Sequence, residues 1–89
     1  MTTVRVQVRY FASVREALGE GEVLDVADGT TLSALRDQLI ARSAAHAEAL
    51  AHDRPLRCAL NMDMCSDAEP IRAGGGAVEV AFFPPVTGG

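Results

Sequence analysis

The sequence predicts an α+β fold in which a mixed β-sheet carries one main helix packed on one of its faces. Residues 3–11 (TVRVQVRYF) and residues 78–83 (VEVAFF) alternate apolar and polar side chains, as strands with one buried face do. Between them, residues 32–40 repeat leucine and isoleucine at helical spacing, which predicts an amphipathic helix. Two further apolar stretches, 22–27 and 56–62, are expected to be the remaining strands.

The N-terminal half of the chain predicts two antiparallel strands joined by a short helix. Alternation in the first strand places its valines on one face and its arginines on the other, and Phe11 falls on the arginine side. Residues 12–21 favour a turn or two of helix, which Gly19 or Gly21 would end. The second strand follows at 22–27.

The main helix is expected to begin after Thr31, whose hydroxyl can accept from a free backbone N–H of the first turn. It should run to about Ala45, and the alanine-rich stretch that follows favours extension toward Ala51 before Pro55. After the third strand, residues 63–77 are rich in acidic residues and glycine and are expected to be mostly loop.

The connection between the helix and the last strand also predicts how the strands are arranged. Its length lets the first and last strands lie parallel as central neighbours, with the helix over one face. Such an arrangement is a ubiquitin-like β-grasp. We expect residues 1–89 to form one domain of this kind, with residues 84–89 as a flexible C-terminal tail.

Composition excludes several classes of function. The net charge is −4, and all eight basic residues are scattered arginines, so the chain lacks the basic patch that a nucleic-acid surface needs. Its apolar runs are too short for a membrane span, and its first residues do not resemble a secretion signal, so a cytoplasmic protein is expected.

Neither the cysteines nor the histidines form a recognisable site. Cys58 and Cys65 lie seven positions apart, a spacing that builds neither a zinc site nor a thioredoxin-like motif, and reduced thiols are expected. His46 and His52 are expected to face solvent. We predict no metal site and no self-contained active site.

The end of the sequence, FFPPVTGG, is the most informative stretch. Phe11 and Phe83 should project from the face opposite the helix and form one exposed apolar patch, unless a loop folds over them. Prolines at 84 and 85 hold the chain extended. The six residues beyond Phe83 can reach roughly 20 Å. Glycines at 88 and 89 would let the last carboxylate pass through a channel too narrow for any β-carbon.

Four segments of the sequence resemble one known family over essentially the whole chain. VEVAFFPPVTGG resembles the C-terminus of the sulfur-carrier small subunit of molybdopterin synthase, and RYFASVREALG resembles the first strand and turn of that family. TTLSALRDQL and ALN fall where its helix and third strand would lie. The stretch RAGGGAVEV departs from the Gly-Asp-Glu-like turn that is usual in the family.

The resemblance implies a carrier that is not catalytic on its own and binds no cofactor. An adenylyltransferase related to ubiquitin-activating enzymes would use ATP to adenylate the Gly89 carboxylate, and a persulfide would convert it to a thiocarboxylate. Within the large synthase subunit, in a heterotetramer, that sulfur would pass to cyclic pyranopterin monophosphate in molybdenum cofactor biosynthesis.

The resemblance also assigns roles to particular positions. Gly89 would carry the sulfur, and the segment threaded into the partner would comprise Pro84, Pro85, Val86, Thr87 and Gly88. Phe11, Met64 and Phe83 match apolar contacts with the large subunit, and Arg15 matches a basic residue used toward partners. Two alternatives share the same terminus: a sulfur carrier for thiazole or cysteine synthesis, and a ubiquitin-like modifier of protein lysines.

Overall fold

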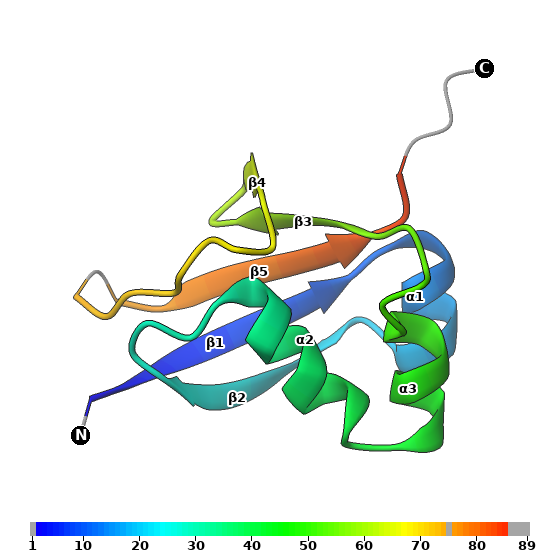
Figure 1. Cartoon of the computed structure of the whole chain (residues 1–89), viewed down its shortest axis with the longest axis horizontal. Coiled ribbons are helices and arrows are strands. Elements are labelled where there is room, and N and C mark those ends of the chain that lie inside the picture. Colours follow the sequence, from blue (N-terminus) through cyan, green and yellow to red (C-terminus); the bar gives the residue numbers. More distant parts are fainter. Residues whose placement is uncertain (1, 75, 86–89) are drawn as a thin grey trace.

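The computed structural model describes residues 2–74 and 76–85 and consists of one five-stranded sheet with three helices (Figure 1). The strands are β1 (Thr3–Tyr10), β2 (Gly21–Ala27), β3 (Arg57–Leu60), β4 (Asp63–Cys65) and β5 (Val78–Phe83). The helices are α1 (Ala12–Leu18), α2 (Leu32–Ile40) and α3 (Ala44–Leu50). The strand order is β2-β1-β5-β3-β4.

The sheet has the mixed topology that the sequence predicts. β1 and β5 pair in parallel, with Val8 opposite Val80, whereas β1 with β2, β5 with β3 and β3 with β4 are antiparallel pairs. The parallel pair requires a crossover, and the helices lie within it and on one side of the sheet (Figure 1). The predicted parallel neighbours are therefore confirmed.

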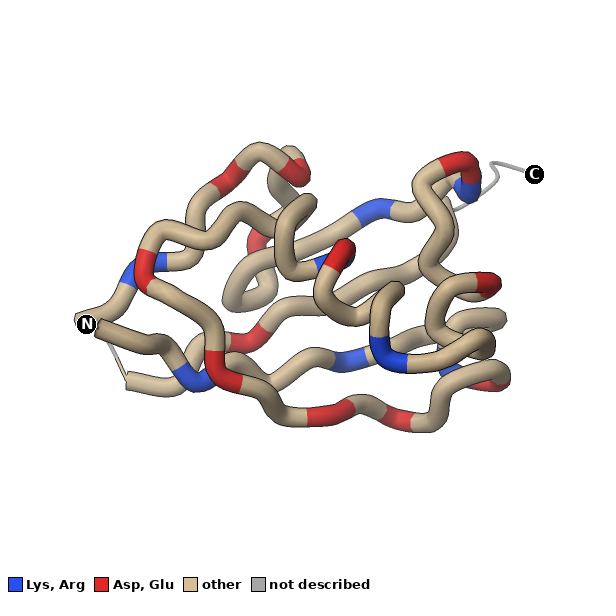
Figure 2. Tube along the Cα trace, turned by 60° about the horizontal axis from the view of Figure 1, so that its bottom comes forward, with Lys and Arg blue, Asp and Glu red and all other residues tan. Residues whose placement is uncertain are grey.

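Alternation along the two parallel strands determines which face of the sheet is buried. Leucines of α2 and α3 pack against every second residue of β1 and β5. The largest side chains of this core, each 2% exposed or less, are Tyr10, Leu32, Leu35, Leu39, Leu50 and Phe82. Among the described residues no helix lies on the opposite face of the sheet, and we call it the open face. Basic and acidic positions are interspersed along the chain (Figure 2).

The predicted single main helix is wrong in its extent, because the helix ends at Ile40 and α3 begins separately at Ala44. Ser43 is the N-cap of α3, and its hydroxyl accepts from the backbone N–H of His46. At the other end of α3, the buried Arg36 donates to the carbonyl oxygens of Leu50 (2.6 Å) and Ala51 (2.5 Å). Ser43 therefore caps the start of α3, and Arg36 of α2 holds the end of α3 through hydrogen bonds.

Other boundaries also differ from the prediction. The third strand, expected over 56–62, is β3 and ends at Leu60. Residues 63–65, expected to be loop, form β4, because Asn61 and Met62 both adopt positive φ (49° and 72°) and make a two-residue hairpin turn. Phe11, expected to be the last strand residue, is the N-cap of α1. It still lies beside the open face, as the alternation predicts.

Candidate functional site

The two phenylalanines at the end of the central strands contact each other. The rings of Phe11 and Phe83 are 6.4 Å apart between centroids, with an interplanar angle of 88°, an edge-to-face pair. The backbone N–H of Phe11 donates to the carbonyl oxygen of Phe82 at 3.3 Å and fixes the chain at this point. Phe11 is 41% exposed and Phe83 is half-buried, so no loop of the described chain covers them.

Met64 lies on the same face, two strands away. It is paired with Ala59 of β3, which is in turn paired with Ala81 of β5, and Ala81 precedes Phe83 by two residues. The Met64 side chain is 58% exposed. Phe11, Phe83, Ala81, Ala59 and Met64 therefore form a continuous set of apolar positions, which we call the open-face patch. The hairpin turn, which the sequence analysis missed, is what places Met64 there.

Arg15 lies next to this patch, on the outer surface of α1. Its backbone N–H donates to the carbonyl oxygen of Phe11 at 3.3 Å. Its guanidinium pairs with Glu20 at 3.0 Å, and both side chains are more than half exposed. The pair is solvated, so Arg15 can exchange Glu20 for a partner's carboxylate at little cost.

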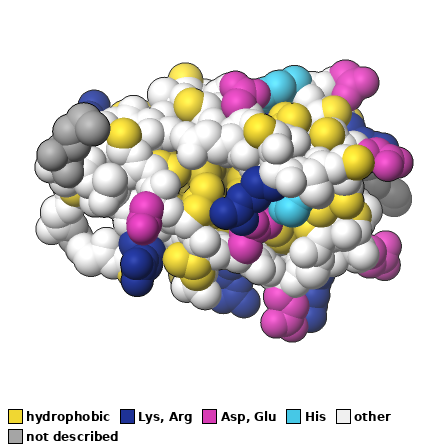
Figure 3. Space-filling view, turned by 90° about the horizontal axis from the view of Figure 1, so that it is seen from below, with side chains coloured by type: hydrophobic (Ala, Val, Ile, Leu, Met, Phe, Trp, Pro, Cys, Tyr) yellow, Lys and Arg dark blue, Asp and Glu magenta, His cyan; other side chains and the backbone are white. Residues whose placement is uncertain are grey.

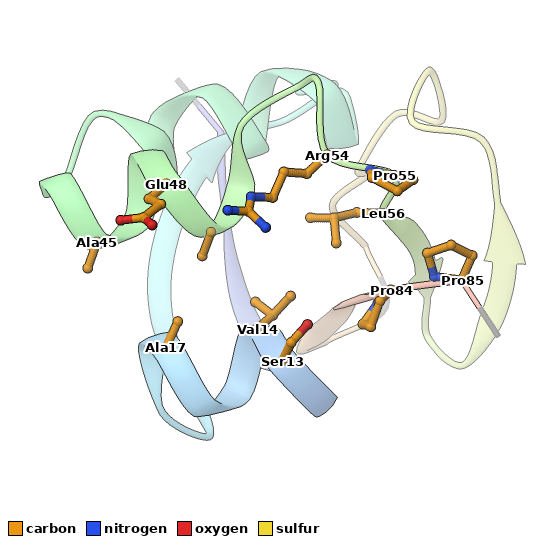
Figure 4. Close-up of a pocket in the computed structure, with 11 residues that line it drawn as sticks. Ser13, Val14, Ala17, Ala45, Glu48, Arg54, Pro55, Leu56, Pro84 and Pro85 are labelled. Atoms are coloured by element: carbon orange, nitrogen blue, oxygen red, sulfur yellow. The ribbon is translucent and has the colours of Figure 1, made fainter. Parts of the chain in front are cut away.

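Pro84 and Pro85 lead the chain away from the end of β5. Both line a cavity of about 480 Å³ between α1, α3 and the segment 54–56 (Figure 4). The side chains of Val14 and Leu56 line it with apolar atoms, and the guanidinium of Arg54 points into it. The four other predicted tail residues, Val86, Thr87, Gly88 and Gly89, lie outside the described residues.

Comparison with known proteins identifies the family of this chain. The sequence model of the ThiS family matches residues 8–89. The chain belongs to the ThiS family. It is 43% identical over 84 residues to the molybdopterin synthase sulfur carrier subunit of Escherichia coli (strain K12), and 33% identical over 84 residues to that of Haemophilus influenzae (strain ATCC 51907 / DSM 11121 / KW20 / Rd). Each alignment covers 94% of this chain and 99% of the relative.

A solved structure shares the fold of this ThiS-family chain. It is the complex of subunits 1 and 2 of molybdopterin-converting factor from Helicobacter pylori 26695, in which the matching chain is 25% identical, with a TM-score of 0.62. The match covers 97% of this chain and 100% of that one. The resemblance noted from the sequence and the predicted β-grasp are both confirmed.

A polar cluster on the helix side of this ThiS-family chain escaped the sequence analysis. Buried Tyr10 donates to Glu22 at 2.7 Å, and the same carboxylate oxygen lies 2.7 Å from Nε2 of His46. Arg42 pairs with the other Glu22 oxygen. Burial raises the pKa of Tyr10 to about 12, and the charge of Arg42 opposes this rise. His46, expected to face solvent, is instead 17% exposed.

The Glu22 cluster joins β2 to α3 through hydrogen bonds and ion pairs. Each Glu22 oxygen already has a partner, and the Ser43 hydroxyl, 2.7 Å from Nδ1 of His46, is held as a helix cap. Histidine, acidic and basic side chains are mixed on the face shown in Figure 3. Residues 2–74 and 76–85 contain no group of three or more His, Cys, Asp or Glu side chains placed to hold a metal ion. No helix among them is long and apolar enough to cross a membrane.

Proposed function

We propose that this chain is the sulfur-carrier small subunit of a molybdopterin synthase. The observation that supports the proposal most directly is its 43% identity, over 99% of the relative's length, to a molybdopterin synthase sulfur carrier subunit. The geometry agrees with a carrier, because β5 runs through the open-face patch and continues directly into the two prolines that precede the tail.

The proposed chemistry takes place at the Gly89 carboxylate. A carboxylate is a poor electrophile, so an adenylyltransferase would first join it to AMP from ATP, with release of pyrophosphate. A persulfide sulfur then displaces AMP and forms an acyl disulfide. A second thiol of the partner enzyme attacks this disulfide, becomes disulfide-bonded to the persulfide-bearing cysteine, and releases the thiocarboxylate. ATP and the persulfide belong to the partner enzymes, and this chain supplies only the acyl group.

The open-face patch is the surface we assign to the large subunit. Exposed aromatic and methionine side chains are enriched at the centres of protein interfaces. Phe11, Phe83 and Met64 provide them, and Arg15 adds a charge at the edge. In this arrangement the large subunit binds the patch while its active site receives residues 84–89. We propose a heterotetramer, in which sulfur passes to cyclic pyranopterin monophosphate and the carrier is not catalytic by itself.

A transfer assay tests the function. The thiocarboxylated chain is mixed with the large subunit and cyclic pyranopterin monophosphate, and formation of the dithiolene product is followed together with the carrier's mass. We expect product to form as the carrier returns to the carboxylate. The variant lacking Gly89 should retain patch binding and give no product, and sulfur transfer by this variant would overturn the proposal.

The same assay distinguishes the alternative readings. A carrier for thiazole or cysteine synthesis would become thiocarboxylated but would not deliver sulfur to the pterin precursor. A protein modifier would instead form higher-mass conjugates with lysines of other proteins. Each of these results would contradict the molybdopterin synthase proposal.

A further inference from the structure

Cys58 and Cys65 lie directly opposite each other in the β3–β4 hairpin, although seven positions separate them in the sequence. The Cys58 thiol donates to the carbonyl oxygen of Cys65, with Sγ and O 3.4 Å apart. Both cysteines are free thiols on the helix side of the sheet. The sulfur-carrier chemistry proposed above uses neither of them.

The backbone geometry allows a bond between the two sulfurs. Leu60 and Asp63 close the two-residue turn and so form a hydrogen-bonded pair. Hydrogen-bonded and non-hydrogen-bonded pairs alternate along an antiparallel ladder, so Cys58 and Cys65, two positions further from the turn, are also a hydrogen-bonded pair. The Cα atoms in such a pair are about 5.5 Å apart, within the roughly 4.4–6.8 Å that a disulfide requires. Their Cβ atoms are wider apart than in a relaxed disulfide, so the bond would be strained and easily reduced.

The two thiols differ in their access to solvent. Both line a cavity of about 280 Å³ that also touches Arg36 and Asp67. Cys65 is half-buried, whereas Cys58 is 6% exposed. Burial raises the pKa of Cys58 to about 11, and the adjacent Cys65 thiol adds to the rise. Cys65 is therefore the thiol that an oxidant reaches first.

We propose that Cys58 and Cys65 are a reversible thiol–disulfide pair that cross-links β3 to β4. With a low-molecular-weight disulfide as oxidant, the Cys65 sulfur attacks one of its sulfurs, forms a mixed disulfide and releases one thiol. The Cys58 sulfur, which gives its proton to solvent, then attacks Cys65 and expels the second thiol. Two cysteine thiols are oxidised, and one small disulfide is reduced to two thiols.

The cross-link would restrain the strand that carries Met64. β4 has only three residues and forms the edge of the sheet, so it is held on one side alone. Met64 precedes Cys65 and points to the opposite face. Oxidation on the helix side would therefore fix the position of an apolar side chain on the open face.

Mass spectrometry tests the pair in the full-length chain. The reduced chain is incubated with oxidised glutathione, free thiols are blocked with N-ethylmaleimide, and the intact mass is measured. We expect a product that lacks two hydrogens, carries no maleimide and is restored by excess reduced glutathione. The Cys58→Ala variant should accumulate a glutathione adduct at Cys65, and the Cys65→Ala variant should stay unmodified.

Three results would overturn the proposal. They are a wild-type chain that keeps both thiols, one that retains glutathione at Cys65, and one that forms disulfide-linked dimers. Amide hydrogen exchange tests the consequence, because residues 57–65 should exchange more slowly in the oxidised chain than in the reduced one. Equal exchange rates would contradict the proposed restraint of β4. None of these readings requires a partner protein.

Discussion

Phe11 and Phe83 form an edge-to-face pair with ring centroids 6.4 Å apart, although 71 residues lie between them in the sequence. The parallel pairing of β1 with β5 brings them together, because Tyr10 is opposite Phe82 and the residue that follows each of them lies at the open face. The pair lies immediately before Pro84. The residues that should bind a partner and the segment that should enter it are thus continuous.

Phe83→Asp should weaken binding to the large subunit by about 2 kcal/mol or more, roughly 30-fold in Kd, since a charge would replace an aromatic side chain at the centre of the interface. Titration calorimetry of the two subunits measures the change. Val23→Asp is the matched control, because Val23 is a 54% exposed apolar residue on the open face but on β2, outside the patch. Equal losses in both variants would contradict the assignment of the patch.

Gly21→Ala should destabilise the fold by about 2–3 kcal/mol, because overpacking against rigid atoms is costly. A Cβ at this position would lie 2.1 Å from the backbone carbonyl oxygen of Val8. Gly19→Ala is the comparison: a Cβ there would have no atom of the described residues within 4 Å, although the φ of +91° is unfavourable for alanine. Urea unfolding should rank Gly21→Ala as the more damaging change, and the reverse order would show that sterics at Val8 do not decide the cost.

The strands and helix that follow from a regular spacing of apolar residues could be predicted from the sequence. Features that depend on contacts between residues far apart in the sequence could not. The alternation predicted for β1 and β5 is confirmed, because every second residue of those strands is buried in the structure. The alanine-rich stretch after Ile40 is as compatible with a continuous helix as with the observed break. Ser43 and Arg36 decide between them, and the carbonyls that Arg36 contacts, at residues 50, 51 and 54, lie 14 or more positions away.

The candidate site shows the same division. The alternation of the strands was enough to assign Phe11 and Phe83 to the candidate interface. Met64 was assigned to it only through the resemblance to the family. Its strand begins after Asn61 and Met62, two residues in left-handed conformation without the glycine that usually marks such a turn. The opposition of Cys58 and Cys65 depends on the same turn and could not be seen in their spacing alone.

Arg36→Met should lower the free energy of unfolding by about 3 kcal/mol, since it removes hydrogen bonds from a charged group and leaves carbonyl groups unpaired. Arg36 is 7% exposed and donates to three carbonyl oxygens at the end of α3 and in the loop after it. Arg5→Met is the matched control, because Arg5 is 75% exposed in its pair with Asp25 and should cost less than about 1 kcal/mol. Guanidinium unfolding measures the stability of both variants. A loss of similar size in each would contradict the stabilising role of the Arg36 hydrogen bonds.

Stability should fall at alkaline pH. Burial raises the pKa of Tyr10 from 10.0 to about 12, so the protonated phenol stabilises the fold fully below pH 10 and this contribution is lost as the pH rises through 12. Burial likewise raises the pKa of Cys58 from 9.0 to about 11. The protonated thiol therefore adds stability that is lost as the pH rises from 9.0 to about 11. Urea titrations from pH 8 upward should show a shallower decline above pH 10 in Tyr10→Phe than in the wild type. An equally steep decline would mean that Tyr10 does not contribute.

The mass of the intact chain after activation shows whether its C-terminus carries sulfur. The chain is co-expressed with its adenylyltransferase and a persulfide donor, purified and measured by electrospray mass spectrometry, alone and after incubation with the large subunit and cyclic pyranopterin monophosphate. We expect a mass gain equal to the exchange of one oxygen for one sulfur. This gain should be absent in the Gly89 deletion and should be lost again when the precursor is converted. An unchanged mass, or a sulfur that stays on the carrier while the precursor is converted, would contradict the sulfur-carrier proposal.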